Sequence, residues 1–505
     1  MHGIILTGFN SHSSAVPSSK RTAGAHRIAT YLRGRDWDIE VLEFVMAFDI
    51  DQLKEFAKSR ITNKTIFIGF GGTFPIWSNT LDEFFTWIRE VYPYVNIIAG
   101  GQVSNLYKIR ADWYVDGFGE RALEALLKHI IGNEQIRWHF GVNGRKVIKG
   151  NLDYPSYPMS DLSITYEDRD FILETETLTT ELGRGCVFNC AFCNFPILGV
   201  KEDPTRDANN FYEELQDTYD RFGVTKYIIA DETVNDYTEK LEKFAGAVKK
   251  LNFQPRMHGF VSNDLLVSLP HDCDIMIAMG FTGHHYGIES TNHNTLKVIG
   301  KGMHPDKLLP GLVKARNYFK KYSNYKADIS LIAGLPYETK QSLETTLKWV
   351  STNWKTESIA LFPLYIPRVE LDNNKSILSF DYIKHGYRET AYNYMPDIQE
   401  QYGKIPTQYG MGEGLIHSTG ISWENSEWNI LEVTKIVVDF YKEIATIAGI
   451  SMWKLGEYEN LLKLPYSDLA NKTLSQLNIE ESLFYQKNIE FLNNYIEKKL
   501  NWRPK

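Results

Sequence analysis

Cysteine is scarce in this 505-residue chain, which has only four, three of them within eight residues. So few thiols exclude a disulfide framework and indicate a reducing compartment. Long apolar runs are also missing, since no stretch approaches the eighteen or so apolar residues that a membrane span needs. The N-terminus lacks the charged segment followed by a long apolar stretch that marks a signal peptide. We therefore expect a cytoplasmic protein without a membrane span.

Basic residues are also fewer than acidic residues. The chain has 55 Lys and Arg against 63 Asp and Glu, a formal net charge of −8. That balance argues against a broad nucleic-acid-binding surface. Hydrophobic residues make up 43% of the chain, as in ordinary globular proteins. The length is too great for one ordinary domain and predicts two or three.

The clustered cysteines are Cys186, Cys190 and Cys193, spaced C-x3-C-x2-C, with the aromatic Phe192 just before the third. Thiolates are soft ligands that select iron–sulfur clusters, zinc or copper(I). Zinc usually takes four protein ligands from paired elements, and no second pair of matching spacing is present. Closely spaced thiolates on a Gly-containing loop can instead surround one cluster. The alternative is unconnected buried thiols, which this clustering disfavours.

This stretch resembles the signature of radical S-adenosylmethionine (radical SAM) enzymes. The resemblance implies that Cys186, Cys190 and Cys193 each hold one iron of a 4Fe–4S cluster, with Phe192 among the cofactor-binding residues. It also implies that S-adenosylmethionine chelates the fourth iron and is cleaved to a 5′-deoxyadenosyl radical by one electron. An electron donor such as flavodoxin or ferredoxin would then be a partner.

Residues 1–133 alternate short apolar runs with amphipathic segments, which predicts an α/β domain with a doubly wound, Rossmann-like parallel sheet. Ligands of such sheets bind outside the carboxyl ends of the strands. Neither a P-loop nor a dinucleotide-binding glycine motif is present. The expected strands are residues 3–8, 37–44, 65–70, 95–100 and 113–116, and the expected helices 23–33, 51–59, 81–91 and 120–131.

Glycines gather at the expected strand ends, as Gly100-Gly101 and as Gly117-Phe118-Gly119-Glu120. Each could be a simple turn residue, but together they resemble the N-terminal cobalamin-binding domain of one branch of radical SAM enzymes. The resemblance implies bound cobalamin, with Gly100, Gly101, Gly117 and Glu120 as its contacts. No D-x-H-x-x-G motif is present, so no histidine of that kind would bind cobalt.

Residues 134–175 are expected to form a linker, with a hairpin at residues 138–147 turning at Asn143-Gly144. Residues 176–370 repeat the strand–helix alternation six times, which predicts a partial (β/α)6 barrel with its site at the strand carboxyl ends. Residues 371–505 are expected to be mostly helical. The expected barrel strands are residues 179–182, 226–230, 256–261, 281–288, 327–332 and 358–365, and the helices 209–221, 238–250, 305–320 and 340–352.

Several expected barrel strands end in residues that match the radical SAM pattern. The resemblance implies that Asp231 lies at the methionine moiety, that Ser262 contacts the ribose, and that Glu289 accepts a hydrogen bond from the amino group. It also implies that Gly334 and Pro336, within the segment LIAGLPYET, hold the adenine. The alternatives are a structural role for Asp231 and a helix-capping role for Glu289. No residue is assigned a catalytic role.

Two further groups limit the chemistry. The adjacent His284 and His285 should point to opposite faces of their strand, so that one is packed and the other faces the barrel. Cys273 alone remains outside the motif, so this sequence has no second set of three thiolates, and the methylthiotransferase subclass is disfavoured.

The leading hypothesis is therefore a cobalamin-dependent radical SAM enzyme that methylates an unactivated carbon of a small-molecule or peptide substrate. One alternative keeps the radical but not cobalamin, and predicts a rearrangement, cyclisation or oxidation. Another alternative is a non-catalytic iron–sulfur protein for electron transfer or sensing.

Overall fold

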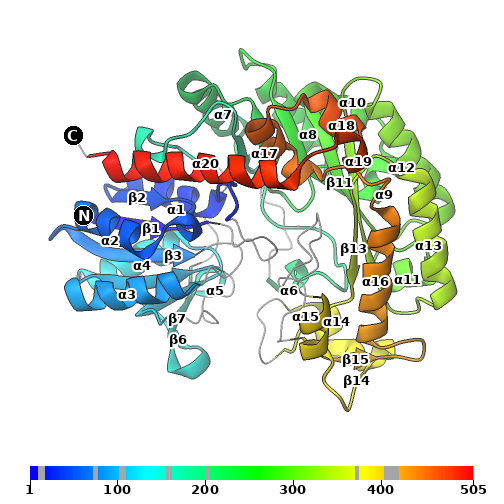
Figure 1. Cartoon of the computed structure of the whole chain (residues 1–505), viewed down its shortest axis with the longest axis horizontal. Helices are drawn as coiled ribbons and strands as arrows, with labels where there is room; N and C mark the ends of the chain where they lie inside the picture. Colours follow the sequence, from blue (N-terminus) through cyan, green and yellow to red (C-terminus); the bar gives the residue numbers. More distant parts are fainter. Residues whose placement is uncertain are drawn as a thin grey trace.

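The computed structural model describes residues 1–8, 17–71, 78–101, 110–132, 134–154, 159, 162–198, 205–369, 375–402 and 420–503. One mostly parallel and one fully parallel sheet, each with helical layers, make up most of the chain, and a helical C-terminal region runs back across both of them (Figure 1). The predicted α/β class is confirmed. Within the described ranges, no helix has the length and apolar character to span a bilayer.

The first sheet has the strand order β2-β1-β3-β4-β5-β7-β6, in which β6 alone runs antiparallel to its neighbour. The predicted hairpin is present, with both Asn143 and Gly144 at positive φ. It pairs with β5, so the first sheet continues into the stretch expected to be a linker. Its strands are β1 (His2–Leu6), β2 (Asp38–Leu42), β3 (Thr65–Gly71), β4 (Asn96–Gly100), β5 (Trp113–Asp116), β6 (His139–Phe140) and β7 (Lys146–Lys149).

Helices cover both faces of this sheet, as expected for a doubly wound domain. On one face lie α1 (Ala23–Arg33) and α4 (Glu120–Ile130), and on the other lie α2 (Ile50–Arg60) and α3 (Asn79–Val91). The second face also takes up α20 (Glu481–Asn501), whose Leu492, Tyr495 and Ile496 are buried there (Figure 1). The end of the chain is thus part of the N-terminal core.

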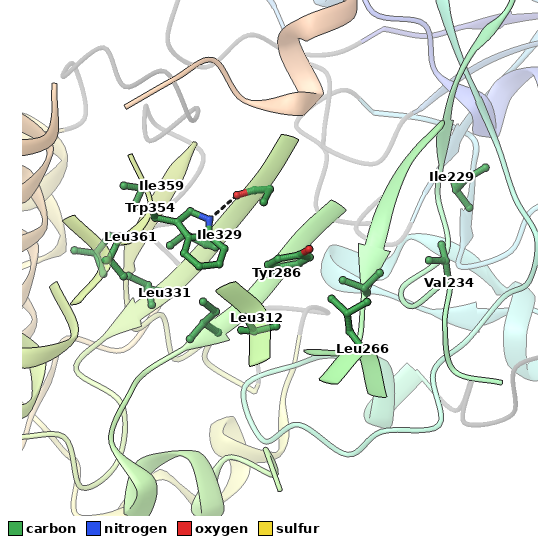
Figure 2. Packing of buried hydrophobic residues seen from close by; sticks show 14 of the residues in the cluster. Ile229, Val234, Leu266, Tyr286, Leu312, Ile329, Leu331, Trp354, Ile359 and Leu361 are labelled. Atoms are coloured by element: carbon green, nitrogen blue, oxygen red, sulfur yellow. Dashed lines mark hydrogen bonds between the residues drawn. The ribbon is translucent and has the colours of Figure 1, made fainter. Parts of the chain in front are cut away.

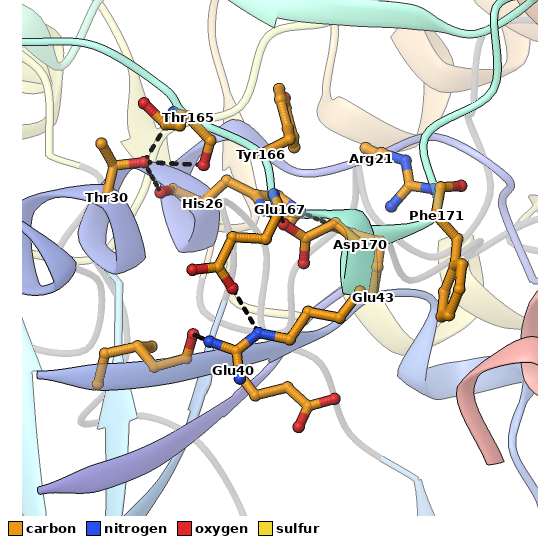
Figure 3. Close-up of polar contacts among 12 residues, drawn as sticks. Arg21, His26, Thr30, Glu40, Glu43, Thr165, Tyr166, Glu167, Asp170 and Phe171 are labelled. Carbon is orange, nitrogen blue, oxygen red and sulfur yellow. Dashed lines mark hydrogen bonds and ion pairs between the residues drawn. The ribbon is translucent and has the colours of Figure 1, made fainter. Parts of the chain in front are cut away.

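Residues 162–176 pack along α1 and β2 (Figure 3). The Thr165 N–H donates to the Thr30 hydroxyl at 2.9 Å, and Arg21 donates to the Phe171 carbonyl at 3.0 Å and pairs with Glu176. This segment therefore joins the two sheets by polar contacts, of which the Arg21–Glu176 pair is buried. The Tyr154–Pro158 part of the expected linker lies largely outside the described residues.

The second sheet consists of six parallel strands in chain order, and no described strand closes it into a full barrel. This confirms the partial barrel. Its strands are β8 (Thr177–Thr180), β9 (Lys226–Ile229), β10 (Arg256–Val261), β11 (Phe281–Glu289), β12 (Lys326–Ala333) and β13 (Ile359–Pro363). Its helices are α7 (Ala208–Phe222), α8 (Thr238–Val248), α9 (Asn263–Ser268), α10 (Asp272–Met279), α11 (His293–Val298), α12 (Pro305–Phe319) and α13 (Lys340–Asn353).

The outer face of this sheet is the main hydrophobic core. Side chains such as Tyr286, Ile329 and Leu331 are fully buried between the strands and the helices (Figure 2). The Trp354 indole fills a gap in that layer and donates to the Ala327 carbonyl at 2.6 Å. Because this layer is closed, the inner face of the sheet is left for a site.

The C-terminal region is mostly helical, as predicted, with one short antiparallel pair. The segment Ser451–Met452 lies on the inner side of the barrel sheet, where its hydroxyl and N–H both donate to the Asp328 carboxylate, at 2.8 and 2.7 Å. Its elements are α14 (Ile377–Asp381), β14 (Arg388–Glu389), α15 (Met395–Tyr402), β15 (Trp423–Glu424), α16 (Ile430–Ile444), α17 (Met452–Leu462), α18 (Tyr466–Asn471), α19 (Leu474–Leu477) and α20.

Candidate cofactor and active site

The cysteine loop follows β8 and is held from two sides. The Ala191 N–H donates to the Ile299 carbonyl at 3.0 Å, and the Leu378 N–H donates to the Ala191 carbonyl at 2.9 Å. Gly300 has a φ of +85°, and a Cβ there would lie 3.1 Å from the Asn189 carbonyl oxygen. A short α-helix, α6 (Phe195–Leu198), begins directly after the loop. The loop is thus docked on the turn after α11.

Cys186, Cys190 and Cys193 all lie on this loop as free, partly exposed thiols. Burial raises the pKa of all three thiols, that of Cys193 to about 11, so iron binding would have to displace their protons. In the described part of the chain, no three His, Cys, Asp or Glu side chains gather closely enough to hold a single metal ion. Accessible thiols on one loop suit a cluster in which each iron takes one cysteine. Phe192 is partly buried beside them against the barrel core.

Two acidic residues after β9, Asp231 and Glu232, accept backbone hydrogen bonds from the segment that leads into the cysteine loop. Asp231 is buried, accepts the Leu182 N–H at 2.7 Å and pairs with Lys240 at 2.9 Å. Its neighbour Glu232 is partly exposed and accepts the Gly185 N–H at 3.2 Å, while burial raises its pKa to about 8. Asp231 therefore fixes the start of the loop. Glu232, which the sequence analysis did not single out, is the acid that lies closer to the thiols.

Glu289 ends β11 in a conformation that a side chain rarely adopts, with a φ of 66°. The register of β11 against β12 shifts between Gly287 and Glu289. The Glu289 carboxylate folds back over Gly287, where a Cβ would lie 2.4 Å from its Oε1. Lys301 lies 3.7 Å from that oxygen and donates to the Gly287 carbonyl at 2.9 Å. Glycine at position 287 thus makes room for the carboxylate.

The helix-capping alternative for Glu289 is wrong. The next helix, α11, is capped by Asn292, whose side chain accepts the Thr295 N–H at 3.0 Å. Burial raises the pKa of Glu289, and Lys301 opposes that rise. Lys301 and Glu289 also act electrostatically on Cys190. Glu289 is therefore a buried acid close to the cysteine loop.

The segment LIAGLPYET forms the end of β12 and the turn after it. Gly334, at a φ of 86°, donates its N–H to Glu338 at 2.8 Å, and Ser290 donates its hydroxyl to the same carboxylate at 3.1 Å. A Cβ at Gly334 would lie 2.7 Å from the Trp423 ring, and Pro336 is buried in the turn. Glu338, which belongs to the segment that resembles the radical SAM pattern, therefore ties the turn after β12 to the residue after Glu289.

Ser262 follows β10 at the adjacent strand end. Its N–H donates to the Asn235 side chain at 2.7 Å. The neighbouring Asn263 side chain donates to the Gly287 carbonyl at 2.8 Å. The expected S-adenosylmethionine contacts Ser262, Glu289 and Gly334 thus lie along one edge of the sheet, at the ends of consecutive strands.

Gly100, Gly101 and Gly117 lie at the carboxyl ends of the strands of the first sheet, and we call this side of the sheet its glycine edge. Gly101, at a φ of 121°, donates its N–H to the Val115 carbonyl at 3.1 Å. Gly117 has a φ of 91°, and a Cβ there would lie 2.7 Å from the Asn151 side chain, whereas a Cβ at Gly100 would meet no atom of the described residues within 4 Å. Among the described residues, no side chain therefore crowds Gly100, and glycine there permits close approach of a ligand to the backbone. The loops after β1, β3 and β4 contain residues 9–16, 72–77 and 102–109, which lie outside the described residues.

Glu120 connects the glycine edge of the first sheet with the cysteine loop of the second sheet. Its buried carboxylate accepts the Arg184 guanidinium at 2.6 Å, and Arg184 also donates to Glu181 at 3.1 Å. Burial alone would raise the pKa of Glu120, but Arg184 and Arg27 hold it below its ordinary value. Arg184 stands two residues before Cys186. The edge of the first sheet is thereby fixed against the cysteine loop, by a contact that sequence spacing could not reveal.

Comparison with known proteins supports these features. Residues 180–350 match the model of the Radical SAM superfamily, which confirms the resemblance of the cysteine motif. An uncharacterized methyltransferase of Pyrococcus horikoshii is 24% identical over 166 residues, 33% of this chain and 35% of that protein. A putative methylthiotransferase of Methanocaldococcus jannaschii is 27% identical over 183 residues, 34% of this chain and 38% of that protein. The chain thus matches little more than a third of either relative.

Two solved structures resemble almost the whole chain. The radical S-adenosylmethionine methyltransferase TsrM from Kitasatospora setae, with cobalamin and a [4Fe-4S] cluster bound, aligns with a TM-score of 0.65 at 11% identity, covering 98% of this chain and 99% of that one. The cobalamin-dependent S-adenosylmethionine radical enzyme OxsB, with aqua-cobalamin and S-adenosylmethionine bound, aligns with a TM-score of 0.60 at 12% identity, covering 99% and 71%. At these identities the likeness shows a shared fold.

Proposed function

We infer, from the radical SAM domain at residues 180–350, that this chain is a radical SAM enzyme, and we propose that it is a cobalamin-dependent methyltransferase. Its substrate would be an unactivated carbon of a small molecule or peptide. The observation that carries the proposal is the Glu120–Arg184 pair, which holds the glycine edge of the first sheet against the cysteine loop. The bound cobalamin of TsrM and OxsB, and the methyltransferase name of one relative, support it.

The residues of the barrel edge would bind and orient S-adenosylmethionine. Cys186, Cys190 and Cys193 would hold the 4Fe–4S cluster, which when bound supplies the electron that cleaves the sulfonium. Glu289 would accept a hydrogen bond from the amino group of S-adenosylmethionine, a charge-assisted contact worth about 1.5–3 kcal/mol. An N–H donor at this carboxylate would favour its ionised form and so offset the rise in its pKa that burial causes.

The turn at Gly334 would hold the adenine. Glu338 holds the Gly334 turn to Ser290 by two hydrogen bonds, so the adenine-binding turn keeps a constant distance from Glu289. Gly100, Gly101 and Gly117 would let cobalamin, which when bound carries the methyl group, approach the backbone of the first sheet. Glu120 would act by positioning the cysteine loop, since Arg184 occupies its carboxylate.

The test uses anaerobically purified protein with a reconstituted cluster, S-adenosylmethionine and a one-electron reductant, with and without hydroxocobalamin. Methylation of cobalamin would release S-adenosylhomocysteine, so the proposal predicts this product only in the presence of cobalamin. The variant Cys190→Ala is the matched control and should release no 5′-deoxyadenosine. Cleavage to 5′-deoxyadenosine alone would refute methylation and favour a rearrangement, cyclisation or oxidation. A cluster whose EPR spectrum does not respond to S-adenosylmethionine would favour the electron-transfer or sensing protein.

A further inference from the structure

The inner face of the barrel sheet carries a row of partly exposed side chains. Phe260, His285 and Ser330, on the neighbouring strands β10, β11 and β12, are each partly exposed. Their chain neighbours Tyr286 and Ile329 are fully buried in the outer core. The inner face is therefore accessible from within, while the outer face is closed.

Three rings pack together on this inner face, and we call Phe260, His285 and Trp453 the inner ring cluster. The centroids of Phe260 and Trp453 are 4.8 Å apart, those of Phe260 and His285 5.1 Å, and those of His285 and Trp453 6.2 Å. Trp453 belongs to α17, which is anchored to the sheet through Asp328. The cluster thus combines apolar ring surface with one imidazole.

The imidazole of His285 has no hydrogen-bond partner in the described part of the chain. Its Nδ1 is buried and unpaired. The two other strand histidines each have one ring hydrogen bond: His258 to the Tyr466 hydroxyl at 3.1 Å, and His284 through Nδ1 to that of Tyr325 at 2.8 Å, although His284 Nε2 is itself buried and unpaired. A buried polar atom without a partner requires an explanation, and a ligand that bonds to it is one.

The charge state of His285 defines what it can recognise. Burial lowers its pKa to about 4, with a smaller contribution from Lys301, so the ring is neutral at neutral pH. A neutral imidazole offers one N–H donor and one acceptor. Ser330, one strand over, adds a hydroxyl that bonds to no other described side chain. These groups suit an uncharged polar edge and not an ionised one.

The position of the cluster relates it to the proposed reaction. Gly287 lies two residues after His285 and two before Glu289 on β11, and the Glu289 carboxylate folds back over it. Side chains two residues apart on a strand share a face at a spacing of about 6–7 Å. A molecule held by His285 would therefore lie next to the carboxylate assigned to S-adenosylmethionine.

We propose that the inner ring cluster is the substrate-binding site, and that its substrate presents a flat, uncharged ring whose polar edge bonds to His285. This inference rests on the proposed function, because it names the substrate class for the same active site. Trp453 and Phe260 would pack against the apolar part of the ring, and His285 would set its orientation.

The experiment measures binding of two flat probes to cluster-reconstituted protein by calorimetry. Quinoline and naphthalene have nearly the same shape, and only quinoline has a ring nitrogen that can accept the His285 N–H. Wild-type protein should bind quinoline about tenfold more tightly than naphthalene. His285→Phe should weaken quinoline binding about tenfold and leave naphthalene within twofold, whereas Trp453→Ala should weaken both at least fivefold.

Two variants control for damage to the fold. His271→Phe alters an exposed histidine and should change neither affinity, and His285→Asn keeps a hydrogen-bonding group and should retain quinoline binding within threefold. Equal affinities of quinoline and naphthalene for wild-type protein, or unchanged quinoline binding in His285→Phe, would overturn the inference. The assay needs no turnover, so a failure here leaves the cobalamin proposal standing, and absence of cobalamin leaves probe binding unchanged.

Discussion

Replacing Gly287 by alanine tests the geometry of the Glu289 site. The new Cβ would lie 2.4 Å from Glu289 Oε1, while the next nearest atoms, Glu289 Cδ and Lys301 Nζ, are both 3.6 Å away. The carboxylate alone must therefore move. If Glu289 accepts the amino group of S-adenosylmethionine, this displacement loses about 1.5–3 kcal/mol. At 1.36 kcal/mol per factor of ten, the dissociation constant for S-adenosylmethionine should rise roughly 10- to 150-fold.

The assay is equilibrium dialysis of labelled S-adenosylmethionine against cluster-reconstituted protein. Gly302→Ala is the matched control, since of the described residues a Cβ there would meet only Asp264, at an ordinary 3.6 Å, and its affinity should stay within twofold of wild type. Glu289→Ala removes the obstructing carboxylate, so adding Gly287→Ala to it should weaken binding no further. Wild-type affinity in Gly287→Ala, or additive losses in the double variant, would refute the assignment of Glu289.

Three other predictions test separate parts of the molecule. Cys190→Ala should abolish cleavage of S-adenosylmethionine, and any 5′-deoxyadenosine from this variant would contradict the ligand assignment. Glu120→Ala should lower the free energy of unfolding by about 3 kcal/mol, because it breaks a buried pair and leaves Arg184 with Glu181 alone. A double-mutant cycle with Arg184→Ala, measured by urea denaturation, should show strong non-additivity. Additive losses of stability would count against the pair. Burial raises the pKa of Glu338 from 4.5 to about 7, so its contribution to stability is complete below pH 4.5 and is lost as the pH rises through about 7. Between pH 5 and 8, wild-type protein should therefore lose roughly 2–3 kcal/mol more unfolding free energy than Glu338→Gln, and parallel pH profiles would contradict this.

Much of the secondary structure could be predicted because it depends on local pattern. The predicted helix at residues 23–33 and strand at residues 256–261 have the bounds of α1 and β10. The helices α9 and α10 were missed because they are short, and α10 has no polar face that would give it a helical period. Local pattern also could not place α20, whose apolar residues are buried against a sheet formed by the other end of the chain.

The site was predictable where motifs are contiguous and not where partners are distant. The cysteine motif is contiguous in the sequence, and the resemblance to radical SAM enzymes pointed to Glu289, which the structure places near Cys190. Glu120 was expected to contact a ligand, yet its carboxylate bonds to Arg184, which lies 64 residues away in the chain. Asp231 likewise bonds to the backbone of Leu182. Sequence position identifies that an acid lies at a strand end, but only the fold decides which donor it meets.

The most direct test of the central claim is the cobalt content of the protein. The cluster would be reconstituted anaerobically, the protein incubated with hydroxocobalamin and desalted, and cobalt measured per chain alongside the absorbance spectrum. The proposal predicts close to one cobalt per chain, with the cluster intact. Protein that keeps its cluster and S-adenosylmethionine cleavage but retains no cobalt would contradict it, and the glycine edge of the first sheet would then need another ligand.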